Sequence, residues 1–273
     1  MKKFIAACLS ILVGTFGYTI AETAIDTRVA NLEAECSSLK EVVSDLCELH
    51  NISTSEPTTP IVSEYMNETE FATFINAETA KIANNGQYTV TRESEYITPL
   101  DVGGATDILN KIVQAIDETS SLEQVVAGFL DIGTVKADIP NTNIKSDYKI
   151  KATSLTAEDI EDLSFKNGKY TFTLAKATNP KKAGTAPLSR FTNDFITQDE
   201  VTNSISSYTT AIKINSTTFN YSNIKVEVTV SNDKITNIRY SYVFDANAAI
   251  KAVVTINGSC TVETNSSYTN ILY

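Results

Sequence analysis

Few side chains in this sequence could serve nucleophilic or metal chemistry. The chain contains a single histidine, His50, and four cysteines, Cys8, Cys36, Cys47 and Cys260. Hydrolysis of the nucleophile–histidine kind needs an imidazole beside a nucleophile and an orienting group, whereas His50 ends an amphipathic segment and precedes a polar linker. One histidine with scattered cysteines also provides no set of zinc ligands. The sequence therefore predicts neither a catalytic nor a metal site.

Acidic side chains are the remaining source of chemistry. The densest group is Glu158, Asp159, Glu161 and Asp162. Two facing carboxyl groups can cleave a glycosidic bond, but a solvated turn or a short helix capped by Thr156 explains the group more simply. The chain has no tryptophan, and Gly103-Gly104 has neither the lysine nor the spacing of a phosphate-binding loop. We therefore expect a protein that is not an enzyme and has no cofactor.

Charge and composition exclude two kinds of partner. The 273 residues carry a net charge of −11, and the sequence pI is about 4.7. Nucleic acids and anionic lipid surfaces both need a basic face on the protein that binds them. The hydrophobic content of 42% is sufficient for a folded core. We expect no nucleic-acid partner.

The N-terminus has the three parts of a secretory signal peptide, over residues 1–21. Lys2 and Lys3 form the basic region, and an uncharged, mostly apolar stretch follows over residues 4–18. Thr19-Ile20-Ala21 then ends in small residues of the kind that a signal peptidase recognises. We expect a protein that is secreted or held at the cell surface. An uncleaved anchor helix is the alternative, because residues 4–21 come close to the ~20 residues that span a bilayer.

Residues 22–50 are predicted to form a short amphipathic helix. Apolar residues recur at alternating intervals of three and four, which is the a/d pattern of a coiled coil. The candidate oligomer interface consists of Val29, Leu32, Leu39, Val43 and Leu46. The alternative is that the helix packs on the chain's own domain.

Cys36 and Cys47 lie on this predicted helix, eleven residues apart. The rise of an α-helix separates them by about 16 Å along the axis, which is too far for a disulfide within one helix. An intermolecular disulfide in a parallel assembly is one interpretation. The other is that both cysteines are small apolar side chains of the helix face.

Residues 51–65 form a polar linker with two prolines, and residues 66–273 form the main domain. Helices dominate its first half. The patterns that predict helix starts are Asn67-x-x-Glu70, Ser120-x-x-Glu123 and Thr197-x-x-Glu200, and apolar periodicity predicts a further helix over 105–116.

Alternating apolar residues predict strands in the rest of the domain. The clearest segments are 148–152, 170–174, 224–230 and 238–244, and Asn257-Gly258 is either a hairpin turn or a bulge. Strands joined by tight turns are antiparallel, and their alternation gives one covered and one wet face. The predicted fold class is α+β: a curved antiparallel sheet with helices packed on one face, preceded by a signal peptide and a short amphipathic or coiled-coil helix.

This order of elements resembles, at the level of fold, the half-barrel domains of exported lipoprotein carriers and related lipid-binding proteins of bacterial envelopes. The resemblance implies an apolar cavity between helices and sheet. We therefore expect an exported binding protein of the cell envelope or the extracellular space, with a hydrophobic small molecule or an envelope protein as its partner. The alternative is a structural or adhesive surface protein that self-associates through residues 25–50.

Overall fold

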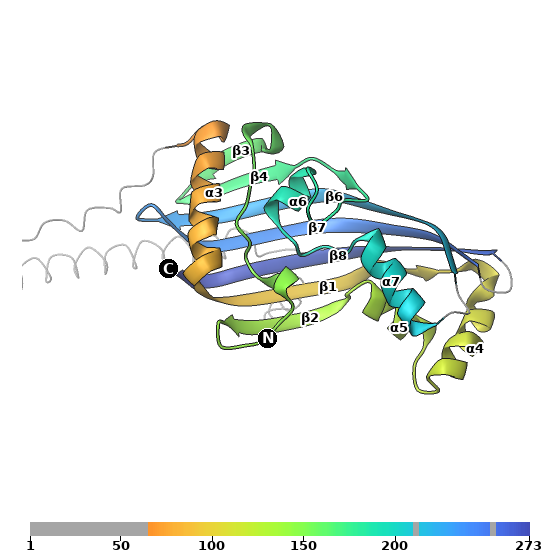
Figure 1. Ribbon diagram of the computed structural model, residues 1–273. Helices are drawn as coiled ribbons and strands as arrows, with labels where there is room; N and C mark the ends of the chain where they lie inside the picture. The colour runs from red at the N-terminus through yellow and green to blue at the C-terminus, as the bar shows by residue number, and fades with distance from the viewer. Residues whose placement is uncertain (1–64, 210–212, 252–254) are drawn as a thin grey trace, which may run out of the picture. The chain divides into compact units, whose positions relative to one another are not determined.

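The structure is a computed structural model in which residues 65–209, 213–251 and 255–273 are described (Figure 1). It combines helices with an open antiparallel sheet of eight strands, which confirms the predicted α+β class. The predicted signal peptide 1–21, amphipathic helix 22–50 and linker 51–65, apart from Tyr65, lie outside the described residues. Within those residues, no helix has the length and hydropathy needed to cross a bilayer.

Four long strands form the centre of the sheet. The strand order is β2-β1-β8-β7-β6-β4-β3, and the short β5 pairs with β6. The strands are β1 (Gln87–Asp101), β2 (Gly133–Ile139), β3 (Glu161–Lys166), β4 (Lys169–Leu174), β5 (Ala177–Thr178), β6 (Lys213–Ser231), β7 (Lys234–Lys251) and β8 (Thr255–Leu272). All neighbouring pairs are antiparallel.

The helices lie over one face of this sheet, as Figure 1 shows. They are α3 (Glu68–Asn85), α4 (Thr106–Ile116), α5 (Leu122–Phe129), α6 (Pro187–Phe191) and α7 (Gln198–Tyr208), with 3-10 turns η1 (Gly103–Ala105), η2 (Ser146–Tyr148) and η3 (Ala157–Asp159). Helix α3 crosses the strands at one end of the sheet, whereas α4, α5 and α7 gather at the other end. We call this second end the distal end.

The alternation of side chains along β7 shows how sequence gives one covered and one wet face. Tyr240, Tyr242 and Phe244 are at most 5% exposed, because they point beneath the helices. Ser241 and Val243 stand between them and point to the opposite, open face, as does Arg239 before them. Burial of the aromatic set provides much of the hydrophobic stabilisation of the sheet.

Helix α3 is fixed to the sheet by aromatic and aliphatic side chains on one face. Phe71 and Ile75 are completely buried, and the Phe71 ring stacks on Tyr170 of β4 with a centroid distance of 4.5 Å. The predicted capping box is present: Asn67 Oδ1 accepts from the Glu70 amide at 3.1 Å, and Glu70 Oε2 accepts from the Asn67 amide at 3.0 Å.

We expect Asn67→Ala to lower the free energy of unfolding by about 1 kcal/mol, because the amides of the first turn of α3 lose their acceptor. Urea unfolding followed by circular dichroism measures this change. Thr73→Ala is the matched control, since Thr73 is exposed on the same helix and its hydroxyl bonds only to a backbone carbonyl within that helix. Equal stability of Asn67→Ala and the natural protein would contradict the expectation.

One predicted helix start is displaced by a residue. The capping box of α5 consists of Ser121 and Gln124, and not of Ser120 and Glu123. The Ser120 hydroxyl instead donates to the Asp117 carboxylate at 2.6 Å, in the turn that follows α4. Both serines can cap a helix, and the competing bond to Asp117 selects the second.

Asn257-Gly258 is neither a hairpin turn nor a bulge in the β7–β8 ladder. The two residues pair with Ala249 and Ala248 in continuous register. Strand β7 extends to Lys251 and β8 begins at Thr255, so the change of direction falls before Asn257.

The predicted strand over 148–152 is wrong. Tyr148 ends the turn η2, and the chain after it runs without a ladder partner. The Ile150 amide donates instead to the Tyr88 hydroxyl at 3.0 Å. Tyr148 and Ile150 are both buried, so the alternation correctly indicates which side chains face the core, although side-chain acceptors replace a neighbouring strand.

Candidate ligand-binding cavity

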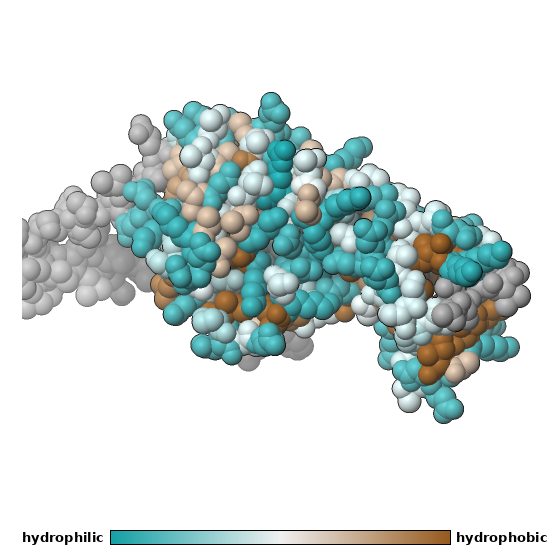
Figure 2. All heavy atoms as spheres, viewed as in Figure 1, coloured by the Kyte–Doolittle hydropathy of each residue, from teal (hydrophilic) through white to brown (hydrophobic). Residues whose placement is uncertain are grey.

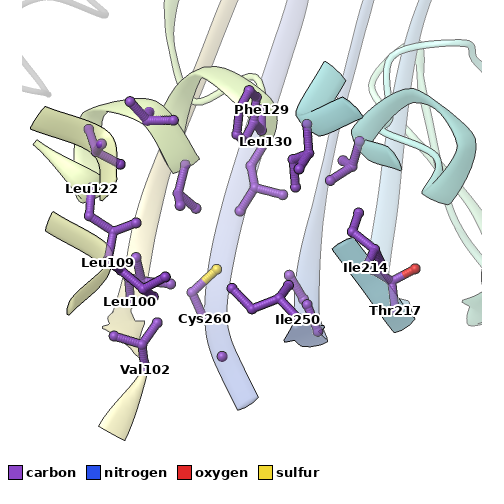
Figure 3. Close-up of a pocket in the computed structure, with 18 of the residues that line it drawn as sticks. Leu100, Val102, Leu109, Leu122, Phe129, Leu130, Ile214, Thr217, Ile250 and Cys260 are labelled. Carbon is purple, nitrogen blue, oxygen red and sulfur yellow. The ribbon is translucent and has the colours of Figure 1, made fainter. Parts of the chain in front are cut away.

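The distal end of the domain contains an apolar cavity between helices and sheet, shown in Figure 3. Its volume is about 120 Å³. From the helices its wall includes Leu109, Val113, Leu122, Phe129, Val201 and Ile205. From the strands it includes Phe219, Ala246, Ala248, Ile250, Gly258 and Cys260. We call this space the distal cavity.

Small inward-facing residues make the floor of the distal cavity. Along β7 the inward positions change from large aromatic side chains to Ala246 and Ala248. On β8 the direct partners of these two alanines are Cys260 and Gly258. Four small residues on adjacent strands, one of them a glycine, therefore replace the aromatic layer found elsewhere, and the helices above do not descend to fill the space.

Helix α4 forms part of the roof. Its inner face is apolar, and its Asn110 Oδ1 accepts from the Leu122 amide at 3.1 Å, which joins the start of α5 to α4. Ile108 and Ile116 of the same helix remain 44% and 43% exposed. Figure 2 shows apolar surface gathered at this end of the domain. The distal cavity thus lies under a helix that also presents apolar side chains to solvent.

The wall of the distal cavity is nearly free of polar chemistry. Among the described residues, none that lines it is an Asp, Glu, Lys, Arg or His. Figure 3 shows the Cys260 sulfur directed into the space beneath the helices. Burial, with a smaller effect of Asp245, raises the pKa of the Cys260 thiol to about 11. The thiol is therefore protonated at neutral pH and is a weak donor and a poor nucleophile.

Two tyrosine hydroxyls at the distal end are buried without a hydrogen-bond partner among the described residues. Tyr208, the last residue of α7, lines the cavity. Tyr96 on β1 does not line it, but lies close enough to Cys260 and Glu123 for them to affect its ionisation. Burial is the main cause that raises the pKa of Tyr96, so the hydroxyl stays protonated and can donate as well as accept.

We expect Cys260 of the folded protein to react slowly with iodoacetamide, at a rate that rises about tenfold per pH unit up to pH 11. Only the thiolate reacts, and a pKa of about 11 leaves about one thiol in a thousand ionised at pH 8. Peptide mass spectrometry reads Cys260 separately from the other cysteines. The control is the same reaction in urea, where the ordinary pKa of 9.0 applies. Equal rates in both conditions would count against a buried thiol.

The raised pKa of Cys260 also makes the stability of the folded protein depend on pH. A group whose pKa is raised by folding stabilises the folded state while it is protonated. The contribution of Cys260 is therefore complete below about pH 9 and is lost as the pH rises toward about 11.

A second cluster of chemistry-bearing side chains lies in the core. It consists of Arg92, Asp194, Tyr240, Tyr242 and Ser266, and we call it the polar network. Asp194 Oδ1 accepts from Arg92 Nε at 2.6 Å. Asp194 Oδ2 accepts from the hydroxyls of Tyr240 at 2.9 Å and Ser266 at 2.6 Å, and the Asp194 carbonyl accepts from Tyr242 at 2.8 Å. The network joins the segment after α6 to β1, β7 and β8.

The charges of the polar network are compensated within it. Burial works against the charge on Arg92, but the Asp194 carboxylate together with Tyr242 and Tyr148 outweighs this and raises the pKa of Arg92. Arg92 also donates to the Asp131 carbonyl at 2.9 Å and lies over the Tyr148 ring, 5.0 Å from its centroid. Both carboxylate oxygens of Asp194, and the Nε and Nη1 atoms of Arg92, are therefore engaged by protein groups within the core.

The acidic cluster of residues 158–162 does not form a facing pair of acids. The turn η3 is capped by Thr156, as the sequence predicts. Asp159 Oδ2 accepts from the Thr156 amide at 2.8 Å and from Arg190 at 2.8 Å, and Glu158 and Glu161 are not buried beside it. The Asp159 carboxylate therefore caps the turn η3 and forms an ion pair with Arg190.

The site residues predicted for the N-terminal helix lie outside the described residues. They are Cys36, Cys47, Val29, Leu32, Leu39, Val43 and Leu46. Self-association through this helix, an intermolecular disulfide, and a structural or adhesive role therefore stay predictions. Within the described part of the chain, Cys260 is a free and buried cysteine.

Sequence reasoning did not identify the residues of the distal cavity. Cys260, Tyr208 and the small floor residues were not singled out, although one signal was available. The inward positions of β7 change abruptly from aromatic residues to alanine, and the matching stretch of β8 contains Gly258. When the residues that pair across two neighbouring strands are all small, the core above them has unfilled space unless other elements move in.

Comparison of the chain with protein families, with curated proteins and with solved structures finds no match. Among the described residues, no three His, Cys, Asp or Glu side chains are grouped so that they could hold a metal ion. The candidate site is therefore assigned on geometry and chemistry alone.

Proposed function

We propose that this protein is an exported, non-enzymatic binding protein that holds a small apolar molecule in the distal cavity. The observation that supports the proposal most strongly is a space of about 120 Å³ whose wall is almost entirely aliphatic and aromatic. An engineered apolar cavity of roughly 150 Å³ stays free of water and binds benzene. The distal cavity is of similar size, which favours a single ring or a short chain over a lipid with long acyl chains.

Binding is favoured over catalysis by the chemistry of the wall. The Cys260 thiol, which faces the space, is held protonated mainly by burial, and among the described residues none that lines the cavity has an ionic side chain. Such a wall contributes by removing apolar ligand surface from water, at about 25 cal/mol per Å². It offers no group that could activate a nucleophile or stabilise a developing charge.

Thermal unfolding of the full chain with benzene tests this proposal. A ligand at about ten times its Kd stabilises the folded state by about 1.4 kcal/mol, which raises the Tm of a domain of this size by roughly 3–5 °C. Solvent extraction of the purified protein, followed by mass spectrometry, would in addition identify a molecule carried from the source. No Tm shift at saturating benzene, together with an empty extract, would refute the proposal.

A further inference from the structure

We propose that the ligand of the distal cavity is uncharged and carries a hydrogen-bonding atom, as in an alcohol, a phenol or a ketone, and that this atom meets the Tyr208 hydroxyl. The inference rests on the proposed function, because it specifies the chemical class of the same ligand. Three observations support it: the placement of Tyr208, its unused hydrogen-bonding capacity, and the absence of ionic groups from the described wall.

The fold directs Tyr208 into the wall of the cavity. Val201, Ile205 and Tyr208 follow one another at intervals of four and three on α7, so they share one face of the helix, and all three line the cavity. The Tyr208 ring packs edge-to-face on Phe129 of α5, with centroids 5.7 Å apart and an interplanar angle of 80°. This contact fixes the ring in a cavity wall that is mainly apolar, with Thr209, Thr217 and Ser259 as its other hydroxyl-bearing residues.

The hydroxyl of Tyr208 has unused hydrogen-bonding capacity. It is buried and has no partner among the described residues, whereas buried polar groups in folded proteins nearly always have one. A water molecule is a poor substitute here, because an ordered buried water needs two to four polar partners and the described wall is mainly apolar, with Thr209, Thr217 and Ser259 as its other hydroxyl-bearing residues. A polar atom on an otherwise apolar ligand satisfies the hydroxyl without requiring further polar groups from the wall.

The cavity wall also selects against ionised ligands. An ion that enters an apolar site loses its hydration and needs an opposite charge in return. The described wall residues supply none, since they include no acidic or basic side chain. The net charge of −11 adds a further penalty for anions. A ligand with a neutral polar atom avoids both costs.

The test compares benzene, phenol and benzoate, which share one ring size and differ in polarity and charge. Their Kd values are measured by isothermal titration calorimetry at pH 7 on the full chain and on Tyr208→Phe. We expect phenol to bind about three- to tenfold more tightly than benzene, which is the contribution of one neutral hydrogen bond. The Tyr208→Phe variant should bind benzene as before and lose the preference for phenol.

Tyr96→Phe is the matched control, because Tyr96 has the other buried tyrosine hydroxyl without a partner among the described residues but does not line the cavity. This variant should keep the preference for phenol. Equal Kd values for benzene and phenol, or a preference that survives in Tyr208→Phe, would overturn the inference and leave the proposed function intact. Benzoate that binds as tightly as phenol would overturn the uncharged class. Failure of all three probes to bind, together with an empty solvent extract, would instead remove the proposed function itself.

Discussion

Replacing Asp194 with asparagine is expected to lower the free energy of unfolding by about 3–5 kcal/mol. The substitution keeps the shape of the side chain but leaves the Arg92 guanidinium buried without its counter-charge. The side chains of Arg92 and Asp194 are only 4% and 1% exposed, so water cannot compensate. Because domains are stable by about 5–15 kcal/mol in total, the loss is a large fraction of the whole. Urea unfolding followed by circular dichroism measures it.

A surface ion pair provides the matched control for Asp194. Lys169 and Glu227 pair across β4 and β6 at 2.9 Å, and both side chains are 42% exposed. Glu227→Gln should cost only about 0–1 kcal/mol, because exposed pairs are screened by solvent. Similar losses for the two carboxamide variants would show that burial of the Arg92–Asp194 pair does not govern its energetics.

A double variant keeps this expectation testable if Asp194→Asn does not fold. Arg92→Gln combined with Asp194→Asn removes the unpaired charge along with its partner. The double variant should therefore be more stable than the sum of the two single losses indicates, with a coupling energy of at least 1 kcal/mol. Additive losses would show that the hydroxyl bonds of Tyr240 and Ser266, and not the ion pair, dominate the polar network.

The sequence predicted the long strands only where their alternation is uninterrupted. Strand β6 shows the limit, because its inward residues are Phe219 and Tyr221 and then Ile224 and Val226. The register against β7 shifts between Ser222 and Lys225. This bulge reverses the phase of alternation, so a period-two pattern can be followed only from residue 224 onward, and the first half of the strand was not predicted.

The edge strands were missed for a different reason. The edge strand β2 alternates weakly, with Ala137 and Ile139 as its buried residues, and β3 has no fully buried side chain. A strand at the edge needs less apolar surface, because it has only one neighbour and its outer rim faces water. Its pairing is decided by the neighbouring strand, which a local pattern does not contain.

The distal cavity could be anticipated as a class of site but not located. The order of helices and strands led to the expectation of an apolar space between them. Its position depends on Tyr208, Phe129 and Ala248, which come from three elements far apart in the sequence. Whether short side chains on β7 and β8 leave a cavity depends on how closely α4, α5 and α7 approach, and this is a property of tertiary packing.

Ala248→Leu is expected to abolish the binding of benzene and, at the same time, to maintain or raise stability. Ala248 lies on the floor of the distal cavity, so the larger side chain occupies the space that the ligand would take. Filling an apolar void recovers buried surface and dispersion contacts worth up to about 1–2 kcal/mol. The benzene-induced rise in Tm should disappear, and the Kd should weaken by at least tenfold.

Ala249→Leu is the matched control, because it adds the same side chain at the next position of β7, which strand alternation turns to the open face. Benzene should raise the Tm of this variant as it does for the natural protein. A benzene response that survives in Ala248→Leu would place the binding site elsewhere in the chain. A gain in stability with loss of binding would instead show that the small floor residues are maintained at the expense of stability, as expected of a cavity kept for a ligand.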